Sequence, residues 1–265
     1  RSIRKMHTPE PAIFVFDTPP VLDPRMYAAA FLEPTPDTAK GSKIATASTT
    51  VKIEGKEHLF AVPSHAALCL NLSQKAFEKI KEIELSHAFK DTSYGYVSEE
   101  KLSLLYELFE QVISNTVFAC TAIEAFCNQV IPDDYVYTKK RQDKKCTETY
   151  NKDQIERFIN LDEKLSTVLP EVTQCNFRKG SSLWNDYHNL RKIRDRIIHV
   201  KSTDLGVKES KEKNIWEELL KRKNIDCSII AHKIISIFKV EVDPSESPVA
   251  SGRNRWIDHF PFKHS

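Results

Sequence analysis

The chain has little of what nucleotide and metal sites are built from. Only 6 of its 265 residues are glycine, and the sequence contains no Walker loop, no glycine-rich dinucleotide pattern and no His-Glu-x-x-His motif. Its 6 cysteines are scattered, without a Cys-x-x-Cys pair or the ligand spacing of a zinc site. Because phosphate loops need glycine and zinc sites need closely spaced ligands, we expect no cofactor and no metal.

Long hydrophobic runs are also missing. No apolar stretch approaches the roughly 18 residues of a membrane span, and the basic start Arg1–Lys5 is not followed by the hydrophobic part of a signal peptide. Scattered cysteines are typical of reduced thiols. We therefore expect a cytoplasmic protein without membrane association. The net charge of +2 neither requires nor excludes a nucleic-acid partner.

With 40% hydrophobic and 29% charged residues, the sequence predicts a globular fold that changes character along the chain. Seven prolines before residue 40 exclude a long helix there. Strand patterns over 12–16 and 49–62, with a hairpin turn at Glu54-Gly55-Lys56, predict a small antiparallel β element within residues 1–63. Residues 64–240 have helical periodicity, and 241–265 form a tail whose aromatic residues are expected to dock on the helices. The predicted class is mainly α, with helices near 65–89, 98–131, 152–169, 181–200, 210–222 and 225–240.

The helix over 98–131 is the clearest single element. Apolar residues recur every three or four positions, Ser98 can cap its start, and Pro132 ends it. Thr121, Glu124 and Asn128 form a polar line on this otherwise apolar helix. Glu124 is either a solvated acid or a carboxylate that pairs with an arginine of another helix.

The helix over 181–200 has two different faces. At about 100° per residue, one stripe is apolar and is expected to face the core, formed by Leu183, Leu190, Ile193 and Ile197. Roughly opposite lie Trp184, His188, Asp195 and His199. An aromatic ring and two histidines on a face that would otherwise be solvated predict a second surface that is buried against something else.

The string Arg194-Asp195-Arg196-Ile197-Ile198-His199 resembles the Arg-polar-x-x-x-His signature of the HEPN superfamily. The string from Thr121 to Asn128 is similar to the helix that precedes the signature helix in that family. The resemblance covers about residues 65–240 and implies an up-and-down helical bundle. Many members are metal-independent endoribonucleases of bacterial defence and toxin–antitoxin systems, and others are inactive RNA- or nucleotide-binding or dimerisation modules. Both alternatives stay open at this point.

The resemblance implies a site shared by two copies of the signature helix in a homodimer. Arg194 and His199 are then catalytic together with Asp195, while Glu124 and Arg191 support them. A guanidinium can clamp a phosphate, and an imidazole can transfer the proton of a ribose 2′-hydroxyl. RNA is the expected substrate, and an antitoxin or a regulatory subunit is a candidate partner. The simpler alternatives are an arginine that covers apolar neighbours and a histidine that ends a helix.

A basic segment follows the long helix. Between Asp133 and Lys152, tyrosines accompany Lys139, Lys140, Arg141, Lys144 and Lys145. Cations that neutralise phosphates, next to rings that stack on bases, are typical of single-stranded RNA binding. The alternative is an ordinary solvated loop.

Overall fold

A computed structural model describes residues 11–16, 23–26, 29–32, 42–90, 97–141, 146–202, 204, 214–239 and 255–262. The fold is mainly helical with small antiparallel sheets, so the predicted class is confirmed at that level. The chain forms two compact units, residues 1–68 with 239–265, and residues 69–238. The tail groups with the N-terminal unit, and its docking on the helices stays a prediction.

The N-terminal unit contains the predicted antiparallel element. Its strands are β1 (Pro11–Phe16), β2 (Ala29–Leu32), β3 (Ser42–Ile53) and β4 (Lys56–Ala61). The long strand β3 pairs with β1 and β2 through its first half and with β4 through its second half. Glu54 and Gly55 connect β3 to β4 with φ angles of 49° and 84°. Two consecutive positive φ angles are what a two-residue hairpin turn requires, so this predicted turn is confirmed.

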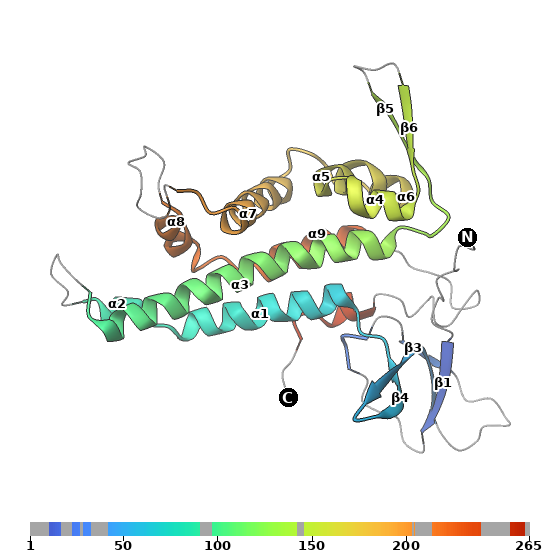
Figure 1. Cartoon of the computed structure of the whole chain (residues 1–265), viewed down its shortest axis with the longest axis horizontal. Coiled ribbons are helices and arrows are strands. Elements are labelled where there is room, and N and C mark those ends of the chain that lie inside the picture. The colour runs from blue at the N-terminus through green and yellow to red at the C-terminus, as the bar shows by residue number, and fades with distance from the viewer. Residues whose placement is uncertain are drawn as a thin grey trace. The chain divides into compact units, whose positions relative to one another are not determined.

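The helical unit is organised along one long helix, α3 (Glu99–Val130) (Figure 1). The helix α1 (His65–Glu82) begins in the N-terminal unit and continues into this one, where Ser73 Oγ donates to the Asn115 carbonyl of α3 at 2.8 Å. Later in the chain come α7 (Ser182–Ile198), α8 (Ile215–Arg222) and α9 (Cys227–Ile237), which all contact α3. The core therefore lies along the apolar face of α3, on residues such as Leu108, Val112 and Ile123.

Shorter elements fill the rest of this unit. They are α2 (Leu85–Ala88), α4 (Lys152–Phe158), α5 (Leu161–Glu163), the π-helical turn η2 (Lys164–Val168) and α6 (Leu169–Thr173). The sequence predicted one helix over 152–169, but the structure breaks it at Ile159, because Asn160 starts a new helix by accepting a hydrogen bond from the Glu163 N–H at 3.0 Å. Between α3 and α4 the chain forms a two-stranded hairpin of β5 (Tyr137–Arg141) and β6 (Cys146–Tyr150), where a loop was predicted.

Candidate functional site

The helix α7 carries the residues of the Arg-x4-His string at its C-terminal end. Ser181 caps its start by accepting from the Trp184 N–H at 3.1 Å, and the helix ends at Ile198. His199 is the C-terminal cap, and its backbone N–H donates to the Asp195 carbonyl at 2.9 Å. The His199 side chain is exposed, and so are its apolar neighbours Ile198 and Val200. The imidazole is therefore open to a ligand.

Arg194 points toward the protein rather than into open solvent. Its side chain is 22% exposed, and its Nη1 lies 3.3 Å from Asp195 Oδ1. The guanidinium is close enough to Cys120 of α3 to interact with the thiol, and its buried Nε has no hydrogen-bond partner. Burial raises the pKa of the Cys120 thiol to about 12, so the thiol stays neutral at physiological pH. Among the described residues, the carboxylate that contacts this guanidinium is that of Asp195, at 3.3 Å.

A chain of charges connects Arg194 to another part of the fold. Asp195 lies between the two guanidiniums, with its Oδ2 3.6 Å from Arg191 Nε. Arg191 also forms an ion pair with Asp162 of α5, and Asp162 Oδ1 accepts from Tyr187 Oη at 2.6 Å. Burial acts to raise the pKa of Asp162, but the hydrogen bonds from Tyr187 and Arg191 outweigh it and hold the pKa below 3.8. The sequence indicated neither Asp162 nor Tyr187.

Asp195, predicted to be catalytic together with Arg194 and His199, has its carboxylate facing Arg191 and Arg194. Within the described part of the chain, no hydrogen bond joins it to the His199 imidazole. The arrangement therefore makes Asp195 a bridge between two arginines, and leaves His199 without a carboxylate partner among the described residues.

Glu124 does not pair with Arg191 or Arg194 as predicted, because no such ion pair is found among the described residues. It interacts with Lys164 of η2, whose ammonium is almost fully buried at 1% residue exposure. Lys164 Nζ donates to Asn128 Oδ1 at 2.8 Å and to the Glu156 carbonyl at 3.0 Å. The polar line on α3 thus receives a buried cation, away from α7. A lysine within the apolar run Leu161, Leu165 and Val168 was the sequence signal for it.

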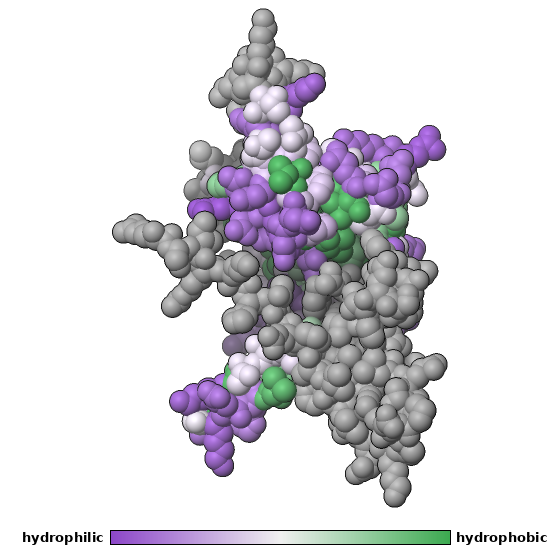
Figure 2. All heavy atoms as spheres, turned by 90° about the vertical axis from the view of Figure 1, so that its right-hand side faces the viewer, coloured by the Kyte–Doolittle hydropathy of each residue, from purple (hydrophilic) through white to green (hydrophobic). Residues whose placement is uncertain are grey.

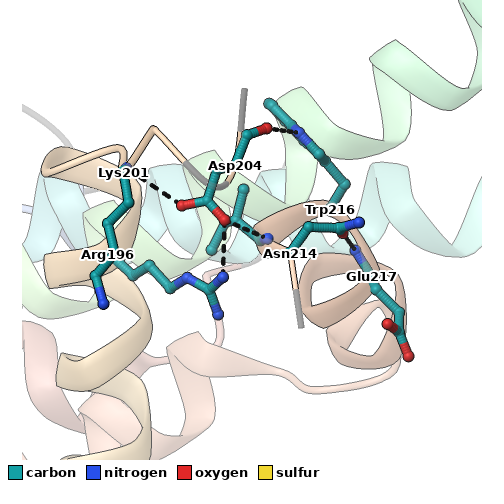
Figure 3. A network of polar contacts seen from close by, with 7 residues as sticks. Arg196, Lys201, Asp204, Asn214, Trp216 and Glu217 are labelled. Carbon is teal, nitrogen blue, oxygen red and sulfur yellow. Dashed lines mark hydrogen bonds and ion pairs between the residues drawn. The ribbon is translucent and has the colours of Figure 1, made fainter. Parts of the chain in front are cut away.

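The turn after α7 is fixed by one buried acid, Asp204 (Figure 3). Its side chain has no exposed surface, and it accepts from Arg196 Nη2 at 2.7 Å, from the Ile215 N–H at 2.8 Å and from the Lys201 N–H at 3.2 Å. Its carbonyl accepts from Trp216 Nε1 at 3.0 Å. Burial acts to raise the pKa of Asp204, but these hydrogen bonds hold it below the ordinary value. Since Arg196 and Lys201 lie on either side of His199 in the chain, Asp204 holds the backbone that presents His199.

Trp184 was predicted to lie on a surface shared with another subunit, and this is wrong. Its side chain belongs to the core of this chain, with the residue only 7% exposed. The indole ring lies 5.0 Å from Phe177 and 5.5 Å from Tyr187, centroid to centroid. The buried face of α7 consists of Trp184, Tyr187, Leu190 and Ile193, so it is rotated from the predicted stripe. Of the predicted second face, the side chains of His188 and His199 are exposed.

The predicted RNA-binding residues belong to the β5–β6 hairpin only in part. Lys139 Nζ forms an ion pair with Glu163 Oε2 at 2.6 Å, and Tyr137 Oη donates to the other oxygen of Glu163 at 2.8 Å. Lys140 is exposed on β5, and Arg141 is the last residue of that strand. Lys144 and Lys145 lie outside the described residues. The end of the helical unit that carries the hairpin is mostly hydrophilic, with small hydrophobic areas, in the upper part of Figure 2. Of the predicted RNA-binding cations that the structure describes, Lys140 is thus exposed on β5, and Lys139 is paired with Glu163.

The described residues contain no group of three or more His, Cys, Asp or Glu side chains placed to hold a metal ion. None of their helices combines the length and apolarity needed to cross a bilayer.

Comparisons with protein-family models, with curated proteins and with solved structures found no match. Any function must therefore be argued from the residues of this chain.

Proposed function

We propose that this chain is a metal-independent endoribonuclease of the HEPN type, in which Arg194 binds the scissile phosphate and His199 transfers a proton. The observation that carries the proposal is the end of α7, where an exposed imidazole follows a partly exposed arginine by five residues. A DNA backbone lacks the attacking hydroxyl, so RNA is the substrate.

Arg194 binds the anion through the part of its guanidinium that is not enclosed. Its side chain is 22% exposed and its Nη1 lies 3.3 Å from Asp195 Oδ1, whereas its Nε is buried without a partner among the described residues. A phosphate oxygen is a strong acceptor for the planar guanidinium. Because packing against α3 already restricts the side chain, little further ordering is needed when the phosphate binds.

The reaction is attack of the ribose 2′-oxygen on the adjacent phosphorus. The 2′-hydroxyl proton passes to a neutral imidazole, the bond from phosphorus to the 5′-oxygen breaks, and that oxygen takes a proton from a protonated imidazole. The products are a 2′,3′-cyclic phosphate and a 5′-hydroxyl. Two imidazoles in opposite protonation states are needed for one turnover without proton exchange. A homodimer through the end of α7, around the exposed Ile198 and Val200, supplies the second His199.

The biological setting that we propose is a bacterial defence or toxin–antitoxin system in the cytoplasm, with an antitoxin or regulatory subunit that restrains cleavage. The second candidate is a catalytically inactive RNA-binding or dimerisation module. The observation that favours it is the pairing of both arginines: Arg191 binds Asp162, and Arg194 contacts Asp195 within a partly buried site. Such pairing also suits a purely structural network.

Cleavage of a single-stranded RNA oligonucleotide and of its all-2′-deoxy counterpart, both in excess EDTA, tests the proposal. We expect the full chain to cut RNA only and to leave cyclic phosphate ends. His199→Ala should reduce the rate by about a hundredfold to ten-thousandfold. His188→Ala is the matched control, because it removes an exposed histidine from the same helix, and it should retain activity. Equal cutting of both substrates, or full activity of His199→Ala, contradicts the ribonuclease proposal.

A further inference from the structure

An open groove lies between α3 and α8, within the helical unit. Its volume is about 910 Å³, and its apolar floor is formed by Leu105, Phe109, Ile113 and Leu220. Two aromatic residues at its edge are well exposed, Tyr106 at 57% and Trp216 at 39%. Large exposed aromatics next to an apolar groove are a common feature of protein-binding sites.

Trp216 is held in place before any ligand arrives. Its Nε1 donates to the Asp204 carbonyl at 3.0 Å, as Figure 3 shows, and its ring lies 5.2 Å from Phe109 at an interplanar angle of 50°. The indole therefore has a fixed orientation while more than a third of the residue remains exposed. A preordered aromatic residue loses little conformational entropy on binding.

The charges at the groove all have one sign. Three of the described residues that line the groove are acids, namely Glu110, Glu217 and Asp204. Asp204 is paired with Arg196, so the acids that can face a ligand are Glu110 and Glu217. Glu217 is paired in part with Lys221 of the same helix, at 2.7 Å. Glu110 has no ion-pair partner within the described part of the chain, and it is exposed. The groove thus combines apolar contacts with a negative charge at Glu110 that no described cation pairs.

We infer that this groove binds an amphipathic helix of a partner protein, with apolar side chains in the groove and lysine or arginine beside Glu110. Along α3 the floor extends from Leu105 to Ile113, which is about 12 Å at 1.5 Å per residue. Two turns of a helix, with apolar anchors spaced by three, four and seven residues, match this length. Basic residues flanking the anchors complement the acidic edge. Such binding requires no ribonuclease activity.

The test uses the full chain and two synthetic helical peptides of about four turns. The first has leucines on one face and lysines on the other, and the second has glutamate in place of every lysine. Binding is measured by fluorescence anisotropy of labelled peptide and by the emission of Trp216, since the chain's other two tryptophans, Trp184 and Trp256, are buried. We expect the lysine peptide to bind and the glutamate peptide to bind at least about tenfold more weakly, which corresponds to about 1.4 kcal/mol.

Variants then place the site. Glu110→Lys should weaken the lysine peptide and strengthen the glutamate peptide, and Tyr106→Ala should weaken both. Asp134→Lys is the matched control, because Asp134 is an exposed acid outside the groove and its reversal should change nothing. No binding of the lysine peptide overturns the inference, and so does equal binding to wild type and Glu110→Lys. Self-association that Tyr106→Ala abolishes would assign the groove to a second copy of the chain and overturn it as well.

Discussion

Asp204 is expected to stabilise the helical unit more than any exposed acid of the chain, and Asp204→Asn tests this directly. The wild-type carboxylate binds three donors through two oxygens, with no exposed side-chain surface. An asparagine keeps one of these oxygens and replaces the other with an NH2 group. With the amide oxygen toward Arg196 and Ile215, the NH2 group faces the Lys201 N–H and cannot accept from it.

The expected cost follows from these contacts. The ion pair with Arg196 is reduced to a hydrogen bond from the guanidinium to an uncharged amide oxygen, and hydrogen bonds to charged groups contribute about 1.5–3 kcal/mol. Loss of the acceptor for Lys201 adds about 1 kcal/mol. We therefore expect the free energy of unfolding to fall by about 3 kcal/mol, or ~6–12 °C in Tm for a unit of this size. Lys221→Gln, which breaks an ion pair between side chains 49% and 47% exposed, should cost at most about 0.5 kcal/mol.

Urea unfolding followed by circular dichroism gives both free energies. Tryptophan emission adds a local signal, because the Trp216 indole donates to the Asp204 carbonyl. If Asp204→Asn unfolds within about 0.5 kcal/mol of wild type, the same margin as Lys221→Gln, the buried network does not stabilise the fold as its geometry indicates. A loss of RNA cleavage without a loss of stability would place the effect of Asp204 on the His199 turn alone.

Three further predictions follow from the contacts of the helical unit. Trp184→Ala should lower the free energy of unfolding by about 3–5 kcal/mol at any protein concentration, because the indole ring is part of the core. A loss of stability seen only on dilution would instead place Trp184 at an interface between subunits. Because the pKa of Asp162 is held below 3.8, its carboxylate stabilises the fold above that pH and the contribution is lost as pH falls through the lowered value. Thermal unfolding of Asp162→Asn at a series of acidic pH values should show a flatter decline than wild type, and parallel curves would contradict this. Lys164→Met should lower the free energy of unfolding, measured with urea, by about 1–3 kcal/mol, because Asn128 and Glu124 lose their nearby cation. Adding Asn128→Leu should recover part of this loss. No recovery would show that the loss comes from removing the ammonium and not from leaving Asn128 unpaired.

The candidate site was only partly accessible to sequence reasoning. The Arg194 to His199 string and the exposure of His199 depend on one helix and its end, and the sequence identified that helix. Asp162, Tyr187 and Asp204 were missed, because their roles arise from contacts across 8 to 25 positions in the chain. For Asp162 and Asp204, the local signal is a carboxylate near a turn or a helix start, which many surface acids share. For Tyr187, the role comes from its partner Asp162, 25 positions away.

What the sequence alone determined was local. The acidic first turn of α3 and its end before Pro132 follow from residues within a turn of one another, as does the positive φ at Gly55 in the β3–β4 hairpin. Ser98 stands at the N-cap position of α3, as predicted, but its side chain makes no capping hydrogen bond. The tertiary structure decided which face of α7 is buried and that Lys164 reaches Asn128 on the polar line of α3. Trp184 and Tyr187 became core because Phe177 and Asp162 lie against them, and Lys164 reached α3 from a π-helical turn. Helical periodicity gives the direction in which a side chain points about the helix axis. Which residue it meets depends on how helices distant in the sequence pack together.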